Sequence, residues 1–349
     1  MNTKIIKLNE NNIDEELIKE AGRIIKDGGV VAFPTETVYG LGGDALNPSS
    51  SKKIYAAKGR PSDNPLIVHI ADVEDMQYIT ESVTMPAKAL ADAFWPGPLT
   101  MILKKSDKVP YETTGGLDTV AVRMPVHKTA AAFIRAAGGY VAAPSANLSG
   151  KPSPTNAKYV IEDMDGRIDM IIDGGDAGIG LESTIVDLTS DIPMLLRPGY
   201  ITLEQLKKVL GSVDVDKTIL DGDCKERPKA PGMKYRHYAP KGDLTIVDGD
   251  MEAVVNRINE LVREAQARGK KTCIIATDEN AGRYDTSYIK SVGSRDDEET
   301  IAHRLYTILR ECDDEDIEVI YSESFEASGI GQAIMNRLLK AAGHNVYHT

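Results

Sequence analysis

The chain has 349 residues, of which 42% are hydrophobic and 27% are charged, and its formal net charge is −12. This length is typical of two domains, and the composition is that of a soluble globular protein, which excludes wholesale disorder. The acidic balance and an aromatic content of 5% argue against a protein whose main task is to wrap nucleic acid.

The N-terminal residues and the cysteines bear on the compartment. MNTKIIKLNENN lacks the apolar run of a secretory signal, and no apolar stretch approaches the ~20 residues of a membrane span. Cys224, Cys273 and Cys312 are odd in number and far apart, without the spacing of metal ligands. We therefore expect a protein of the reducing cytoplasm.

The first 211 residues predict an α/β domain with one twisted, mixed sheet. Apolar periodicity predicts a helix over 14–27, and VVAFPT follows it as a buried strand. A helix with a serine cap is expected over 49–58, and PLIVHI reads as a short strand. Further helices are predicted over 85–94, 128–137, 156–162 and at ITLEQLKKVLG, with strands at TMILKK, DTVAVRMP, YVAAPSA, MIIDGG and STIVDLT.

The rest of the chain has a different organisation. Residues 212–243 are rich in Asp, Lys, Pro and Gly and include APGMKYRHYAP, which predicts a linker. Over 244–349, strands and helices alternate regularly, which predicts a smaller, Rossmann-like parallel sheet. From Thr245 onward there are 20 Asp/Glu against 12 Lys/Arg, so this domain is strongly acidic.

Two Gly/Pro-punctuated segments carry the clearest chemical signal, KGRPSDN at 58–64 and PSANLSGKPSPT at 144–155. Such backbone forms rigid loops. Lys58 and Arg60 can grip one polyanion from two sides, and the hydroxyls of the second loop can complete the cage. The Asn64 amide suits a ribose or base edge. Nucleotide chemistry is the first interpretation, and two solvated cations after a helix are the alternative.

Other segments are ambiguous by themselves. In PTETVYGLGGDA, the run from Thr35 to Thr37 ends a buried strand, where ligand groups often lie, but the segment is neither a Walker A loop nor G-x-G-x-x-G. A plain tight turn is favoured there. Arg123 in VAVRMP needs an anionic partner, either an internal carboxylate or a ligand carboxylate. His69 in LIVHI is either a satisfied core residue or a functional one. Arg197 in LRPG is either phosphate-facing or superficial.

These segments, taken in order, resemble the YrdC-like threonylcarbamoyl-adenylate synthases. KGRPSDNPLIVHI, PTETVYGLGGDA, FWPGPLT, PSANLSGKPSPT, ESTIVDL and LRPG carry the resemblance, and APGMKYRHYAP with the extra α/β domain resembles the long, two-domain form. It implies a YrdC-type fold with a concave positive cavity. It also implies that L-threonine, bicarbonate and ATP give L-threonylcarbamoyl-AMP and diphosphate, the first step in modifying adenosine 37 of tRNA.

The resemblance also assigns residues and partners. Lys58 and Arg60 are implied as the catalytic cations, Mg²⁺ would accompany ATP, and a separate transferase complex would receive the product. The threonine pocket would comprise Thr37, His69, Arg123, the backbone at Ala143, and Ser183. The nucleotide site would comprise Arg60, Asn64, Thr119, Ser145, Asn147, Ser153 and Arg197, with Tyr238 closing over it.

Three alternatives are open. An RNA-binding module could use the positive cavity, although net charge and scarce aromatics weigh against it. The C-terminal domain could be a regulatory or partner-binding unit only, since it offers no catalytic set. Carbamoyl transfer of the hydrogenase-maturation type requires zinc-finger cysteines, which this sequence lacks.

Overall fold

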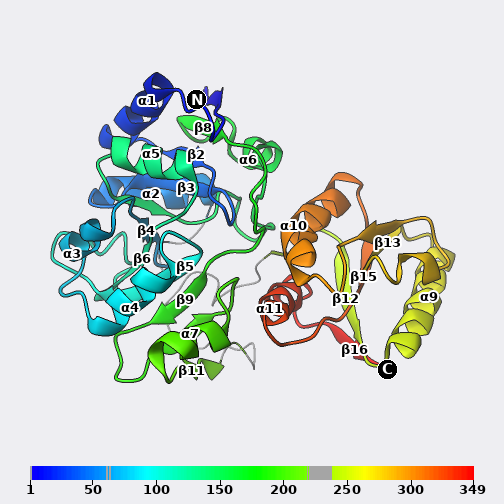
Figure 1. Cartoon of the computed structure of the whole chain (residues 1–349). Coiled ribbons are helices and arrows are strands. Elements are labelled where there is room, and N and C mark those ends of the chain that lie inside the picture. The colour runs from blue at the N-terminus through cyan, green and yellow to red at the C-terminus, as the bar shows by residue number, and fades with distance from the viewer. Residues whose placement is uncertain (1, 60–61, 63, 218, 220–237) are drawn as a thin grey trace. The chain divides into compact units, whose positions relative to one another are not determined.

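The computed structural model describes residues 2–59, 62, 64–217, 219 and 238–349. They form two compact units (Figure 1): one comprises residues 1–149 and 153–234, and the other comprises residues 150–152 and 235–349. Arg60 and most of the predicted linker lie outside the described residues, so the linker prediction stays a prediction.

The first unit is built on one mixed sheet of eleven strands, in the order β1-β8-β2-β3-β7-β4-β6-β5-β9-β10-β11. Parallel pairs such as β4–β6 alternate with antiparallel pairs such as β5–β6, as the sequence predicts. The strands are β1 (Lys4–Lys7), β2 (Val31–Phe33), β3 (Gly40–Asp44), β4 (Ile67–His69), β5 (Leu99–Lys104), β6 (Thr119–Arg123), β7 (Val141–Ala143), β8 (Met170–Asp173), β9 (Thr184–Asp187), β10 (Met194–Arg197) and β11 (Asp214–Val215).

Helices cover this sheet unevenly. The helices are α1 (Glu15–Lys26), α2 (Pro48–Lys58), α3 (Met76–Ile79), α4 (Met85–Phe94), α5 (Lys128–Ala136), α6 (Ala157–Met164) and α7 (Leu203–Leu210), with a 3₁₀ turn η1 (Val73–Asp75). On one face, the core face, α2, α4, α6 and α7 contribute to a continuous apolar cluster with the strands. On the opposite face, α1 and α5 pack over the part of the sheet that runs from β1 to β7, where their apolar residues join those of β1, β8, β2 and β7 (Figure 1).

The rest of that second face, over β4, β6, β5 and β9, is called the open face here. Alternation along β6 explains its character: Val120 and Val122 join the core cluster, whereas Thr119, Ala121 and Arg123 point to the open face. The small apolar cluster on the open face consists of strand residues only, namely Ile67, Ile102, Ala121, Ile185, Leu196 and Met194. The polar side chains of these strands therefore lie on the open face, where the apolar cluster includes no helix residue.

Two local predictions were wrong. The cap of α2 is Asn47, whose side chain accepts from the Ser49 backbone N–H, and not a serine. GLGGD is strand β3 and not a plain turn. Its glycines serve packing, because a Cβ on Gly42 would lie 2.7 Å from Val141 Cγ1 and 3.0 Å from Phe33 Cε1.

The second unit contains a five-stranded, all-parallel sheet in the order β14-β13-β15-β12-β16. This confirms the predicted Rossmann-like alternation. Arg310 also holds the Gly150–Pro152 segment in this unit: its Nε and Nη2 donate to the Pro152 carbonyl oxygen at 3.0 and 2.7 Å. The elements are β12 (Asp243–Asp248), α9 (Met251–Ala267), β13 (Thr272–Ala276), η2 (Ala281–Arg283), β14 (Ile289–Ser291), α10 (Glu298–Asp314), β15 (Val319–Glu323), α11 (Gly331–Ala341) and β16 (Val346–His348).

The packing of β3 predicts a cost for the smallest added side chain. Gly42→Ala should lower the free energy of unfolding of the first unit by about 1–3 kcal/mol, because the methyl group overpacks against Phe33 and Val141. Urea titration followed by fluorescence of Trp95, the single tryptophan, measures this. Gly178→Ala is the control, because no atom lies within 4 Å of its added Cβ. Equal midpoints for the two variants would contradict the packing argument.

Candidate functional site

The register of β4, β6 and β7 brings predicted threonine-pocket residues together. His69 pairs with Arg123 across the parallel strands, and Ala143 pairs with Ile67 on the other side of β4. Thr119 begins β6 and Arg123 ends it, so the two are about 13 Å apart along the strand. The sheet thus places the predicted nucleotide residue Thr119 and the predicted threonine residue Arg123 at opposite ends of one strand.

Arg123 is buried and has an internal anionic partner. Its Nη2 lies 2.6 Å from Glu36 Oε1, and its Nη1 donates to Thr37 Oγ at 2.8 Å. Its Nε donates to the Gly97 carbonyl oxygen at 3.4 Å. The internal-carboxylate alternative is therefore correct. The guanidinium uses three of its five N–H donors on described residues, which leaves two for a ligand carboxylate.

His69 is buried, with Nδ1 3.0 Å from the Ile67 carbonyl oxygen. Because a carbonyl only accepts, Nδ1 carries the proton of the neutral ring and Nε2 is an acceptor. Burial, and then the charge of Arg123, lower the pKa of His69 to about 3, so the ring is neutral at physiological pH. A neutral imidazole therefore avoids placing a second positive charge beside the buried Arg123 guanidinium.

Ser183 connects the predicted threonine and nucleotide residues. Arg197 Nη2 donates to Ser183 Oγ at 3.1 Å, and Arg197 Nε donates to the Ser183 carbonyl oxygen at 3.0 Å. Thr100 Oγ lies 2.7 Å from Ser183 Oγ. All three side chains are buried. The sequence analysis missed Thr100; the signal available was its alternation with Met101 in β5, which places it on the open face beside Arg123.

Lys58 holds the second signature loop. Its Nζ donates to the carbonyl oxygens of Ser145 and Asn147 at 2.5 and 2.6 Å, and lies 3.3 Å from Asn147 Oδ1. Ser145 Oγ in turn donates to Asn147 Oδ1 at 2.5 Å, and the Ser149 N–H bonds to the Lys58 carbonyl oxygen. Lys58 is only 2% exposed. Lys58 and the S-x-N segment are thus brought together, with the ammonium bound to loop oxygens.

Two more predicted nucleotide residues are buried nearby. Ser153 Oγ donates to Glu182 Oε1 at 2.6 Å, and both residues are buried. The Asn64 side chain is fully buried, and neither its Nδ2 nor its Oδ1 has a hydrogen-bond partner in the part of the chain that the structure describes. A buried amide without partners costs free energy, so it marks a place where a ligand would supply a donor and an acceptor.

Two predicted site residues do not belong to the described part of the first unit. Arg60 lies outside the described residues. Tyr238 belongs to the second unit, is 5% exposed, and packs its ring against Tyr306 with 5.1 Å between centroids. Its backbone φ of 63° is unusual for a residue other than glycine. The predicted role of Tyr238 over the nucleotide stays a prediction.

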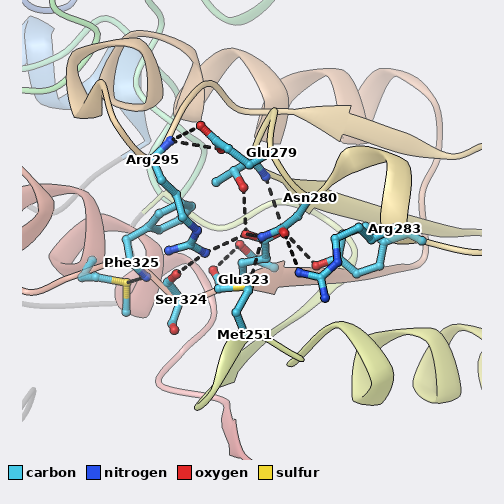
Figure 2. A network of polar contacts seen from close by, with 12 residues as sticks. Met251, Glu279, Asn280, Arg283, Arg295, Glu323, Ser324 and Phe325 are labelled. Atoms are coloured by element: carbon cyan, nitrogen blue, oxygen red, sulfur yellow. Dashed lines mark hydrogen bonds and ion pairs between the residues drawn. The ribbon is translucent and has the colours of Figure 1, made fainter. Parts of the chain in front are cut away.

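The second unit has its own polar network at the carboxyl ends of its strands (Figure 2). Glu323 is fully buried and accepts from Arg295 Nη2 at 2.6 Å, Tyr284 OH at 2.8 Å and Asn280 Nδ2 at 3.1 Å. These donors satisfy the carboxylate, so the network stabilises the unit. A cavity of about 480 Å³ beside it disfavours a polyphosphate, since one arginine faces five carboxylates, those of Asp296, Asp297, Glu298, Glu299 and Glu326.

The described residues contain neither a metal-binding cluster nor a membrane-spanning helix. No group of three or more His, Cys, Asp or Glu side chains is arranged to hold a metal ion. No helix in the described part of the chain is both long and apolar enough to cross a lipid bilayer.

Comparison with known proteins identifies the family. A family model described as "Telomere recombination" matches residues 23–199, and one described as "Threonylcarbamoyl-AMP synthase, C-terminal domain" matches residues 201–343. The threonylcarbamoyl-AMP synthase of Bacillus subtilis is 51% identical over 338 residues, which cover 97% of this chain and 96% of that protein. The chain belongs to the threonylcarbamoyl-AMP synthase family.

Further relatives agree with this assignment. The Pyrococcus abyssi threonylcarbamoyl-AMP synthase is 47% identical over 344 residues, with 99% of both chains covered. The crystal structure of P. abyssi Sua5 complexed with L-threonine superposes with a TM-score of 0.94 at 46% identity, covering 99% of this chain and all of that one. The chain is therefore the long, two-domain form of the family, and the synthase interpretation is supported over the RNA-binding module.

The buried neutral His69 predicts a pH dependence of stability. Because its pKa is about 3 when folded and about 6.5 in an exposed histidine, only the unfolded chain binds a proton here between these values. Stability present above pH 6.5 is therefore lost as the pH falls through this window. We expect the wild type to lose roughly 2 kcal/mol more than His69→Gln between pH 6.5 and 5. Urea titrations by Trp95 fluorescence across this range test it; parallel losses in both proteins would refute it.

Proposed function

We propose that the chain is a nucleotidyltransferase that makes L-threonylcarbamoyl-AMP and diphosphate from L-threonine, bicarbonate and ATP. One observation carries the proposal: the Ser183 hydroxyl, assigned to threonine, accepts a hydrogen bond from Arg197, assigned to ATP. Because the two side chains touch, an amino acid at Ser183 and a phosphate at Arg197 would be neighbours. This is the arrangement that joining the two substrates requires.

The reaction needs two bond-forming steps. The amine of threonine adds to bicarbonate, which forms the N–C bond and releases water. An oxygen of the resulting N-carboxylate then attacks the α-phosphorus of ATP, and diphosphate leaves. No covalent enzyme intermediate is needed, which agrees with the lack of a G-x-S-x-G elbow around Ser145.

The chain would act by orienting two anions and offsetting their repulsion. Two N–H groups of Arg123 would hold the threonine carboxylate as a fork. Arg197 would face the phosphates, and Lys58 would fix the 144–155 loop while its charge stabilises the charge that develops on diphosphate. Arg60 would supply a further cation. Lys58, Arg123 and Arg197 are buried and already bonded to protein oxygens, so little reorganisation of these three cations would accompany the reaction.

We expect Mg²⁺ to arrive with ATP and to be bound mainly through phosphate oxygens, since the described residues hold no metal-binding cluster. The ion would neutralise phosphate charge. Glu182, whose buried carboxylate lies beside Ser153, would contribute a protein oxygen to its binding. We further propose that a separate cytoplasmic transferase complex receives the product and installs it on adenosine 37 of tRNA.

The proposal predicts which substrates the purified chain requires. It should release diphosphate from ATP only when L-threonine and bicarbonate are both present, and without any RNA. Measurement of diphosphate, with mass spectrometry of the adenylate product, tests this. Release that needs RNA, or that is indifferent to threonine, would overturn the proposed function.

The two subsites predict different kinetic losses for two variants. Arg123→Lys keeps the charge but loses the fork, so the KM for threonine should rise roughly tenfold or more with little change in the KM for ATP. Lys58→Ala releases the loop carbonyls and removes a charge, so kcat should fall at least ~100-fold. Steady-state diphosphate release separates the two effects. The same pattern in both variants would argue against separate subsites.

A further inference from the structure

Among the described residues, Glu36 is the carboxylate bonded to Arg123, and only one of its two carboxylate oxygens accepts a hydrogen bond. Oε1 accepts from Arg123 Nη2 at 2.6 Å. Oε2 is buried and has no hydrogen-bond partner among the described residues, although the side chain is 11% exposed overall. A buried carboxylate oxygen without a donor is costly, so its retention calls for an explanation.

Neither of the two neighbouring threonine hydroxyls can donate a hydrogen bond to Glu36 Oε2. Thr35 Oγ donates its only proton to the Val38 carbonyl oxygen at 2.6 Å, because a carbonyl can only accept. In the 2.9 Å contact between the Thr35 and Thr37 hydroxyls, Thr37 is therefore the donor. The Thr37 hydroxyl can then only accept further hydrogen bonds, and it accepts one from Arg123 Nη1. Thr37 has no proton left to give to Glu36.

We propose that Glu36 Oε2 binds the amino group of the amino-acid substrate and takes its proton when the N–C bond forms. This rests on the proposed function. Arg123 and Glu36 together present a cation with unused donors beside an anion with an unused acceptor. An α-amino acid carries a carboxylate and an ammonium on one carbon, so the pair matches both of its charges.

The proton transfer completes the chemistry of the first step. An ammonium has no lone pair and cannot attack bicarbonate. Glu36 accepts one proton, the freed amine bonds to the carbon of bicarbonate, and hydroxide leaves with a second N–H proton as water. The carboxylic acid then returns its proton to solvent after the product departs. Glu36 is thus a catalytic residue for the same site, because it touches the reacting nitrogen.

The titratable groups around Glu36 come from two further elements. Arg123 faces it from β6. His127, which precedes α5, feels the charges of Glu10 and Glu36; its Nδ1 lies 2.8 Å from Glu10 Oε1. Burial is the main cause that lowers the pKa of His127, so this ring adds no fixed cation that would compete for Oε2 at neutral pH.

The test uses Glu36→Gln, which keeps an oxygen for Arg123 and replaces the proton acceptor with an amide. At pH 7, kcat should fall at least ~100-fold. The loss should diminish as the pH rises through the pKa of the substrate's own amino group, because free amine no longer needs the carboxylate. Wild-type kcat should stay flat over the same range. A structural role alone would not produce this pH profile.

A matched variant and a binding measurement complete the experiment. Glu10→Gln removes the other carboxylate near His127 and should keep wild-type kcat and pH profile. Calorimetry with the analogue that has hydroxyl in place of the amino group should show at least tenfold weaker binding than threonine to wild type, and less discrimination in Glu36→Gln.

The outcomes separate this inference from the proposed function. If wild type makes product and Glu36→Gln matches it at pH 7, or loses activity equally at every pH, the inference is wrong and the function stands. If wild type itself makes no product, the proposed function fails. Should Glu36→Gln not fold, Glu36→Asp, with its shorter reach, must show the same pH-dependent loss for the inference to hold.

Discussion

Buried positive charge is the constraint that organises the first unit. Lys58, Arg123 and Arg197 are each 5% exposed or less. A buried cation is tolerated only when oxygen atoms replace its water, and here the oxygens come from segments far apart in sequence. Lys58 requires the 144–155 loop, Arg123 requires the loop after β2, and Arg197 requires the residue before β9. Satisfying these charges therefore assembles the site as the chain folds.

The sheet supplies the surface on which those charges meet. In β6 the sequence TVAVR sends its valines into the helix-covered core and its threonine and arginine to the open face. The same alternation turns Thr100 and His69 toward Arg123. Where α1 and α5 cover this face it is apolar, and where only strands contribute, polar side chains lie beside a small apolar cluster. The distribution of the helices over the sheet thus decides where chemistry is possible (Figure 1).

Much of this could be predicted from local patterns. The helix at 85–94 was predicted to the residue, and the parallel β-α alternation of the second unit was clear because each apolar run is bounded by turn residues. The polar segments of the site could also be recognised, since Gly and Pro punctuate them. Local patterns could not predict which strands pair with one another in the sheet. Nothing in GLGGD indicates a strand until β2 and β7 lie on either side of it.

The same limit applies to the site. That Arg123 bonds Glu36, or that Ser183 bonds both Thr100 and Arg197, depends on register between strands distant in sequence. The alternation of Thr100 with Met101 assigns it to one face of β5 but does not identify its partners. The polar atoms of Glu36 and Asn64 that lack a hydrogen-bond partner among the described residues can be recognised only in a three-dimensional structure. They are also the features that point most directly to a ligand.

A crystal structure of the chain with L-threonine and a non-hydrolysable ATP analogue tests the central claim most directly. The account predicts the amino-acid carboxylate within hydrogen-bonding distance of Arg123, and phosphate oxygens within reach of Arg197 and the loop held by Lys58, in one continuous volume over the open face. Electron density for the two ligands at separate surfaces, or with Arg123 still bonded only to protein oxygens, would contradict it.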